Sequence, residues 1–477
     1  MAATALPPFE LDALARFLAA ENGADRVEIA EPVLLAGGAI KENWGFAACF
    51  AGGRLAGTYD LVLRTDAPTG IASSLGQIEE FAVLQAAHAA GVTVPEPLFA
   101  CADPAVIGKP FFVMRRVVGA AQGRIITTDP ALASSLPGVA RRLARELARL
   151  QKIRPPHPDL NFLPLVGPAE HIASFRAYLD RHPQPRPVLE WATRWLETHI
   201  PEPLSPVLCH RDFRTGNYML DGPDLTGILD WEFAGWGDPD EDIGWLCCKG
   251  WRFARLDREL GGIAERAPFY EAYKEASGRR LDPQRVFFWE VLANVRWAVI
   301  ALQQSDRYLL GGQRDLSTAI IGRRATECDL ELLLLLDPDG APPDRASPDA
   351  RASDGIRDLP SGAELLALAR ESLLGELLPR LPPERDREAR LIATAMAIAK
   401  REAAAGAAPR QEIAARLAEF YGRGDAALRR FAVDLRAGAF ETCEKRGRAA
   451  RALLWQMTML KLREGNPGFL AAHGFGE

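Results

Sequence analysis

The sequence predicts an α+β fold with a β-rich N-terminal region, a mainly helical middle region and a further all-helical region at the C-terminus. Three observations support this prediction. Segments rich in Val, Leu, Phe and Trp are separated by glycine pairs within the first 116 residues, which is typical of strands joined by turns. Apolar residues at helical spacing dominate from residue 131 onward. A stretch of Pro, Asp, Gly, Ser and Ala at 338–360 predicts a linker before the last helices.

The elements of the N-terminal region are expected in a regular order. An amphipathic helix is predicted at residues 9–21 and a second helix from Gln77 to Ala90. Strands are predicted where large apolar residues cluster: Val33–Leu35, Asn43–Phe50, Asp60–Arg64 and Phe111–Met114. Within the helical middle region, a short β-like segment is predicted at Val207–Trp231.

Composition excludes several classes of protein. The 477 residues are 48% hydrophobic and 25% charged, which is ordinary for a globular chain, and the net charge of −6 argues against general nucleic-acid binding. The apolar run Leu332–Leu336 is far shorter than the roughly 18 residues of a membrane helix. No basic residue precedes an apolar run at the N-terminus, so no signal peptide is expected. Seven cysteines without a C-x-x-C pair favour a reducing cytoplasm over a disulfide framework or zinc site.

The segment C-H-R-D-F-R-T-G-N carries the residues best suited to chemistry. His210, Asp212 and Asn217 form an H-x-D-x-x-x-x-N pattern, and an apolar strand further along ends in Asp230. Phosphoryl transfer needs one carboxylate to orient the attacking hydroxyl and accept its proton. It also needs oxygen ligands for Mg²⁺, such as an amide and a second carboxylate. A hairpin between Tyr218 and Leu229 is expected to return Asp230 to the loop of Asp212 and Asn217.

On these residues, the sequence resembles the aminoglycoside phosphotransferase and choline kinase superfamily of small-molecule kinases over roughly residues 25–335. It is most similar to the kinase-like region of acyl-CoA dehydrogenase fusion proteins, and Leu229–Leu246 is the most specific stretch. The resemblance implies a bilobal protein-kinase-like fold, and the Ala-, Leu- and Arg-rich composition of 361–464 predicts a separate small helical domain after it. The expected domains are an N-lobe at 1–116, a C-lobe at 117–337, a linker at 338–360 and a helical domain of unknown role at 361–477.

The resemblance also implies roles for single residues. Asp212 matches the family's catalytic base, and Asn217 and Asp230 match its magnesium ligands. His210 is expected to hold the loop by hydrogen bonds. Asp242 is expected to cap a helix that begins near Ile243, as a structural support.

A cation on the third strand of the family grips the phosphates of ATP and is anchored by a glutamate on the next helix. The matching strand here ends in Arg64, where protein kinases have lysine, and the two are not interchangeable. Its partner is Glu79 or Glu80, and Glu80 is favoured because E-F-A-V-L fits the family's helix better. A solvent-exposed charge at a strand end is the alternative interpretation of Arg64.

Two further segments are expected to contact the nucleotide. In L-A-G-G-A-I-K-E-N, Gly37 and Gly38 would permit close approach of the backbone to phosphate, although a plain hairpin turn explains them almost as well. The segment Phe112–Gly119 resembles the hinge between the lobes. Backbone groups of Met114 and Arg116 would there hydrogen-bond an adenine edge.

The function predicted from these residues is an ATP- and Mg²⁺-dependent phosphotransferase that acts on a hydroxyl of a small molecule. Tryptophans and arginines between residues 245 and 325 favour a hydroxy acid or hydroxyacyl-CoA over a polycationic aminoglycoside, with ordinary core packing as the alternative. Two other classes stay open: a nucleotide-binding pseudokinase acting through its C-terminal helices, and a scaffold that binds no nucleotide. The choice between ATP and GTP is open, as is homo-oligomerisation through the C-terminal helices. No nucleic-acid or membrane partner is expected.

Overall fold

The computed structural model describes residues 9–30, 32–35, 41–67, 74–253, 255–311, 316–342, 362–422 and 426–475. The chain divides into two compact units. The first contains Met1–Gly167 and Pro201–Trp289, and the second contains Pro168–Ile200 and Glu290–Glu477. Gly37 and Gly38 lie outside the described residues, as does 343–361, which holds most of the expected linker.

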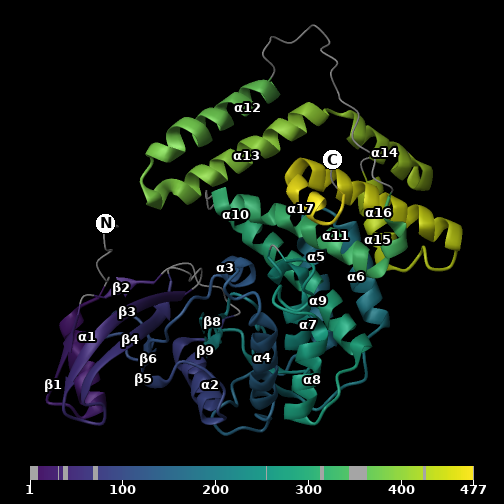
Figure 1. The fold of residues 1–477 in the computed structure, drawn as a ribbon. Coiled ribbons are helices and arrows are strands. Elements are labelled where there is room, and N and C mark those ends of the chain that lie inside the picture. The colour runs from purple at the N-terminus through teal and green to yellow at the C-terminus, as the bar shows by residue number, and fades with distance from the viewer. Residues whose placement is uncertain are drawn as a thin grey trace. The chain divides into compact units, whose positions relative to one another are not determined.

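The first unit begins with a six-stranded antiparallel sheet (Figure 1). Its order is β1-β3-β4-β6-β5, and β2 pairs with β3. The strands are β1 (Arg26–Ile29), β2 (Val33–Leu34), β3 (Lys41–Ala51), β4 (Gly57–Asp66), β5 (Pro97–Cys101) and β6 (Phe111–Arg115). The strands predicted from apolar clusters are present. The sequence reading missed β1, because this short edge strand alternates charged with apolar residues and lacks an apolar cluster.

Alternation along the strands separates a packing face from a functional face. Leu61 and Leu63 on β4 are fully buried in a core that they share with Leu14 and Leu18 of helix α1 (Leu11–Asn22). Because successive side chains of a strand point to opposite faces, Val62 and Arg64 lie on the other face of the sheet. On β6, the same alternation places Phe111 and Val113 in the core shared with α1, and Phe112 in the core on the other face. Because of this alternation, the side chain of Arg64 points away from α1.

The rest of the first unit is mainly helical, with short strand pairs. Its further elements are α2 (Gln77–Ala89), α3 (Gly123–Thr128), α4 (Leu136–Leu150), β7 (Val207–Cys209), β8 (Tyr218–Asp221), β9 (Asp224–Ile228), β10 (Gly235–Gly237), α7 (Glu241–Cys247), a 3-10 turn at Lys249–Trp251 and α8 (Arg266–Ser277). The predicted β-like segment at Val207–Trp231 corresponds to β7, β8 and β9. Helix α4 is amphipathic and presents Leu143 and Leu147 to a core that also contains residues of α2 and α7.

The second unit is helical in its described parts. It contains α5 (Pro168–Arg181), α6 (Pro187–Thr198), α10 (Leu316–Ile321), α11 (Ala325–Leu336), α12 (Gly362–Ser372), α13 (Asp386–Ala405), α14 (Ala408–Tyr421), α15 (Ala427–Arg436), α16 (Glu444–Gly465), α17 (Pro467–Ala472), a π-helical turn at Leu373–Leu377 and 3-10 turns at Gly322–Arg324, Pro338–Gly340, Leu378–Arg380 and Pro383–Arg385. Helix α9 (Pro283–Leu309) begins in the first unit and continues in the second.

The C-terminal helices pack against earlier helices of the same unit. Arg436 on α15 donates to both carboxylate oxygens of Glu190 on α6, at 2.8 and 2.7 Å. Trp455 and Arg451 on α16 both donate to Asp337, which follows α11. The residues beyond 361 thus share one compact unit with α5, α6 and α11. The domain boundaries at 116, 337 and 360 stay predictions.

One helix is long and apolar enough to cross a membrane on length and composition alone. In the part of the chain that the structure describes, this is α9, and 72% of its most apolar 18-residue window is buried inside the protein. A helix buried to this extent is typical of a protein core.

Candidate active site

The loop between β7 and β8 is held by helix α7. The backbone N–H groups of His210 and Arg211 donate to the two carboxylate oxygens of Asp242, at 2.8 and 2.7 Å. Asp242 is fully buried, and burial raises its pKa to about 7 in spite of these two donors. The expectation that Asp242 caps its own helix is wrong. The helix begins at Glu241, and Asp242, in its first turn, reaches across to the loop.

His210 joins this loop to the strand that leads to Asp230. Its Nδ1 accepts from the backbone N–H of Asp212 at 3.2 Å, and its Nε2 lies 2.8 Å from the carbonyl oxygen of Leu229. A backbone N–H only donates and a carbonyl only accepts, so the ring is neutral with its proton on Nε2. Burial lowers the pKa of His210 and favours the same state. His210 thus contacts both the backbone of its own loop and the residue before Asp230.

Two residues of the site adopt left-handed backbone conformations, with φ of 63° at Arg211 and 61° at Asp230. Such values are uncommon for residues other than glycine and cost conformational energy. At Arg211 the side chain is buried and donates to the carbonyl oxygen of Trp236 at 2.8 Å. The contacts of the buried Arg211 side chain thus help to hold the backbone in this conformation.

The carboxylate of Asp212 is held by three side chains. Its Oδ1 accepts from Trp245 Nε1 at 2.8 Å and from Arg214 Nε at 3.0 Å. Its Oδ2 accepts from Asn217 Nδ2. The sequence interpretation left Trp245 either in a substrate region or in the core, and it did not single out Arg214. No local signal marks the contact with Trp245, which lies 33 residues away in the chain, whereas Arg214 lies only two residues from Asp212.

The predicted hairpin brings Asn217 and Asp230 together. Strands β8 and β9 pair antiparallel with Tyr218 opposite Ile228, and the backbone N–H of Leu229 donates to the carbonyl oxygen of Asn217 at 2.8 Å. Asn217 therefore precedes one strand of the hairpin, and Asp230 follows the other.

The residues at this end of the hairpin fit a magnesium ion. The Asn217 amide nitrogen donates to two oxygens of Asp212, which leaves the amide oxygen as the atom for a cation. The side chain of Asp230 is 35% exposed. Amide and carboxylate oxygens suit Mg²⁺, which normally takes its remaining ligands from phosphate and water. No group of three or more His, Cys, Asp or Glu side chains that could hold a metal ion is found in the described ranges.

Arg64 lies at the centre of a buried group of carboxylates. Its Nε is 2.9 Å from Glu80 Oε1, its Nη1 donates to Asp230 Oδ1 at 3.0 Å, and its Nη2 is 3.9 Å from Glu232 Oε1. Glu79 instead accepts from the backbone N–H of Gly76, at the start of α2. The structure thus places Glu80 against Arg64. The side chain of Arg64 is 4% exposed, so it is no solvent-exposed strand end.

Charge and burial oppose each other within this cluster. Burial lowers the pKa of Arg64, but the carboxylates of Glu80, Asp230 and Glu232 outweigh it and raise the pKa above its usual value. Burial raises the pKa of Glu80, against the effect of Arg64. Burial likewise raises the pKa of Glu232 to about 7. Lys41 adds a second positive charge, which lowers the pKa of Glu80 and of Glu232 and so opposes the effect of burial.

A cavity of about 670 Å³ lies between the sheet and the hairpin. Its charged end contains Arg64, Glu80 and Asp230, and its walls include apolar residues from both sides: Leu35, Val62, Leu84, Phe112, Met219 and Ile228. Met114 and Arg116 also line it. The backbone N–H of Arg116 donates to the carbonyl oxygen of Asp60 at 2.9 Å, so this N–H is not available to an adenine edge in this conformation.

Gly119 closes the hinge side of the cavity at a point where only glycine fits. Its φ is 119°, and a Cβ there would lie 2.3 Å from the carbonyl oxygen of Leu220. That oxygen accepts from the backbone N–H of Ala120 at 2.9 Å, in a bridge that joins the hinge to β8.

We expect Gly119→Ala to lower the free energy of unfolding by about 3 kcal/mol and to weaken nucleotide binding, because strain and a steric clash act together. Urea denaturation and a nucleotide titration measure the two effects. Gly108→Ala is the matched control, since Gly108 has a φ of 87° and open space around its Cβ. It should cost about 1–2 kcal/mol, from backbone strain alone. Equal losses in the two variants would contradict the steric argument.

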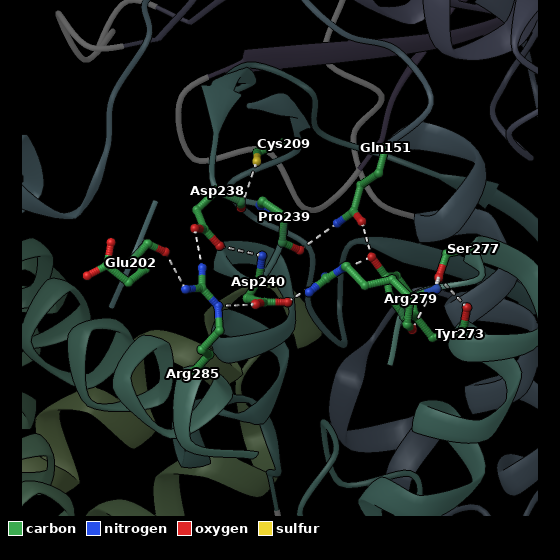
Figure 2. Close-up of polar contacts among 10 residues, drawn as sticks. All are labelled: Gln151, Glu202, Cys209, Asp238, Pro239, Asp240, Tyr273, Ser277, Arg279 and Arg285. Carbon is green, nitrogen blue, oxygen red and sulfur yellow. Dashed lines mark hydrogen bonds and ion pairs between the residues drawn. The ribbon is translucent and has the colours of Figure 1, made fainter. Parts of the chain in front are cut away.

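The start of α7 is anchored by a buried ionic network (Figure 2). Asp240 is fully buried and pairs with Arg279 at 2.5 Å and with Arg285 at 3.0 Å. Arg285 also donates to Asp238 Oδ2 at 2.6 Å. The carbonyl oxygen of Asp238 accepts from the thiol of Cys209, the last residue of β7, at 3.4 Å. The network thus ties α7 to the strand from which the loop of Asp212 departs.

Comparison with known proteins places these features in a family. A model of the phosphotransferase enzyme family matches residues 39–286, slightly more than half of the chain. A second model, for a domain of unknown function (DUF6285), matches residues 379–469.

Two curated relatives carry the name acyl-CoA dehydrogenase. Acyl-CoA dehydrogenase family member 10 of Mus musculus is 31% identical over 201 residues, which cover 39% of this chain and 18% of that protein. Family member 11 of Pongo abelii is 26% identical over 273 residues, which cover 52% of this chain and 34% of that protein. The chain therefore matches only about a third or less of the length of these two relatives.

A solved structure shows the same fold. The crystal structure of a candidate aminoglycoside phosphotransferase from Ralstonia eutropha superposes with a TM-score of 0.56 and 20% sequence identity, over 69% of this chain and 98% of that chain. The kinase-like fold predicted from the sequence, with a β-rich N-terminal region and a helical C-terminal region, is confirmed.

Proposed function

Because the chain belongs to the phosphotransferase enzyme family, we propose that it is a small-molecule kinase that transfers the γ-phosphoryl group of ATP to a hydroxyl group. The observation that carries the proposal is the convergence of three side chains. Asp212, Asn217 and Asp230 gather at the base of one hairpin, and Asp230 is ion-paired to Arg64 at the charged end of the cavity. Each supplies an oxygen atom that phosphoryl transfer requires.

The chemistry of the chain's own residues follows from this geometry. Asp212 orients the acceptor hydroxyl and takes its proton while the hydroxyl oxygen bonds to the γ-phosphorus. The bond from that phosphorus to the β–γ bridging oxygen then breaks, and ADP leaves. Asn217 and Asp230 would hold Mg²⁺, which when bound neutralises charge on the phosphates. Arg64, kept in place by Glu80, binds phosphate oxygens with its fork of donors.

The acceptor is proposed to be a hydroxy acid or a hydroxyacyl-CoA. Two observations support this. The relatives described above are named as acyl-CoA dehydrogenase family members. The surroundings of Asp212 contain Arg214 stacked on Trp251 at 4.5 Å, which suits an anionic or amphipathic molecule better than a polycation. Arg252 does not contribute, because it is buried and donates to the carbonyl oxygen of Cys247 at 2.8 Å. An aminoglycoside is the alternative acceptor.

The proposal has three further parts. The phosphoryl donor is taken to be ATP rather than GTP. A cytoplasmic location and self-association through the C-terminal helices are likewise proposals. A pseudokinase and a scaffold are the competing functions, and they differ from an active kinase in what they bind and turn over.

The first test is a thermal-shift titration with ATP and with GTP, each with and without Mg²⁺. A ligand at a hundredfold excess over its Kd stabilises the folded state by about 2.7 kcal/mol. We expect a magnesium-dependent shift in the wild type that is lost in Asp230→Ala, because this change removes a cation ligand. Asp221→Ala is the matched control, as Asp221 is exposed on the same hairpin.

The outcomes separate the candidate functions. ADP release with hydroxybutyrates or 3-hydroxybutyryl-CoA would support the kinase, and release with kanamycin would favour the aminoglycoside alternative. A magnesium-dependent shift without turnover on any of these acceptors would favour the pseudokinase. No shift with either nucleotide would contradict the proposal and favour the scaffold.

A further inference from the structure

Helix α7 contacts both the backbone and the side chain at the proposed catalytic base. Asp242 accepts the backbone N–H groups of His210 and Arg211. Trp245 donates its indole N–H to Asp212 Oδ1 at 2.8 Å. Residues three apart on a helix share a face, so Asp242 and Trp245 reach the same loop from the same side of α7. The helix therefore fixes where the loop lies and also how the Asp212 side chain is turned.

The two oxygens of Asp212 are not equivalent. An ionised carboxylate offers about two acceptor sites on each oxygen. Both sites of Oδ1 are used, by Trp245 and by Arg214 at 3.0 Å. Oδ2 accepts from Asn217 and retains one site. By this count, Oδ2 is the oxygen that can still accept a hydrogen bond from an acceptor hydroxyl.

Trp245 is better suited than Arg214 to hold this arrangement. Trp245 is 3% exposed and lies on a helix, and its ring packs against Trp251 with centroids 5.1 Å apart. The side chain of Arg214 is 24% exposed, and it has long rotatable bonds. The fixed donor is thus the indole, and the arginine is a contact that can shift.

We propose that Trp245 is a positioning residue for phosphoryl transfer: its indole N–H holds Asp212 Oδ1 and thereby presents Oδ2 to the acceptor hydroxyl. The assignment rests on the proposed function, in which Asp212 is the base. It goes beyond that function because it names the oxygen that receives the proton and the residue that selects it. A tryptophan that only filled space would do neither.

The contact is tested first without any change at Trp245. In a ¹⁵N–¹H spectrum of the full chain, ten tryptophans give indole signals. The indole N–H that donates to a carboxylate should have a chemical shift apart from the other nine. That signal should change position in Asp212→Asn and be missing in Trp245→Phe. If no indole signal responds to Asp212→Asn, the contact is absent and the proposal is wrong. This comparison remains informative if Trp245→Phe does not fold.

Kinetics then tests the role. Trp245→Phe keeps a large ring and removes the N–H, so we expect kcat to fall about tenfold to a hundredfold while the KM for ATP stays within about twofold. Trp236→Phe is the matched control, because Trp236 is a buried tryptophan of the same unit that packs in its core. Equal kcat values in the two variants would overturn the positioning role, as would a loss confined to the KM for ATP.

Failure of the proposed function looks different. In that case the wild type itself releases no ADP with hydroxybutyrates, 3-hydroxybutyryl-CoA or kanamycin, and the assignment of Trp245 falls with the base. Failure of the positioning role alone leaves wild-type turnover intact and removes only the difference between Trp245→Phe and Trp236→Phe.

Discussion

Replacing Asp212 with asparagine is expected to lower kcat by about two to four orders of magnitude, the usual contribution of a positioned general base. An amide does not accept the hydroxyl proton, although it has almost the shape of the carboxylate. Its oxygen can still accept from Trp245 and Arg214, which should keep most of the loop's conformation, although its amide nitrogen cannot accept from Asn217 as Oδ2 does. Asp212 does not line the cavity, and the stabilisation by magnesium nucleotide should therefore persist. Steady-state ADP release and the thermal shift measure the two effects on one preparation.

The control for this variant is Asp224→Asn. Asp224 is exposed at the turn of the hairpin between β8 and β9, so the same chemical change there should leave kcat near the wild-type value. Wild-type turnover in Asp212→Asn would show that another group accepts the proton. Loss of the nucleotide-induced thermal shift in that variant would mean that Asp212 also contributes to nucleotide binding. The fall in kcat would then not by itself identify Asp212 as the base.

The second large effect is expected at Asp240, where Asp240→Asn should lower the free energy of unfolding by about 3–5 kcal/mol. Removing one partner of a buried ion pair leaves uncompensated charge, which is costly in a region of low dielectric. Here two guanidinium groups, those of Arg279 and Arg285, lose their shared carboxylate (Figure 2). Urea denaturation followed by tryptophan fluorescence measures the loss. Urea is preferred to guanidinium chloride because salt screens ion pairs.

A surface ion pair provides the comparison. Asp257 pairs with Arg255 at 2.7 Å, and its side chain is 64% exposed. Solvent screens such pairs, so Asp257→Asn should change the stability by less than about 0.5 kcal/mol. If Asp240→Asn were no more destabilising than Asp257→Asn, the network would not anchor α7. If Asp240→Asn also lowers kcat at temperatures where the variant remains folded, loss of these ion pairs displaces α7 and disturbs the loop of Asp212.

Much of the site could be predicted because its pattern is local in the chain. Asp212 and Asn217 lie on one loop, and the short hairpin of β8 and β9 returns the chain to Asp230, so short-range turn chemistry is enough to bring them together. The same holds for Arg64, whose face of β4 follows from the period of a strand. The choice of Glu80 over Glu79 agrees with the observed ion pair.

Other features could not be read from the chain because they depend on contacts between distant segments. Asp242 has the residue type and position of a helix cap, and nothing nearby indicates that its carboxylate accepts from a loop about 30 residues earlier. Among the backbone groups of Met114 and Arg116 that were expected to contact adenine, the N–H of Arg116 is already used, because strand pairing brings the carbonyl oxygen of Asp60 within reach of it.

The sequence by itself determined the α+β fold class, most of the strands and the group of residues that resembles a kinase site. These depend on periodicity, turns and spacing, which act over a few residues. Only the tertiary structure decided which buried charges meet, which oxygen of Asp212 is occupied, and that the C-terminal helices share a unit with α5, α6 and α11. Burial makes each polar group depend on its partner, and the fold as a whole brings those partners from distant parts of the chain.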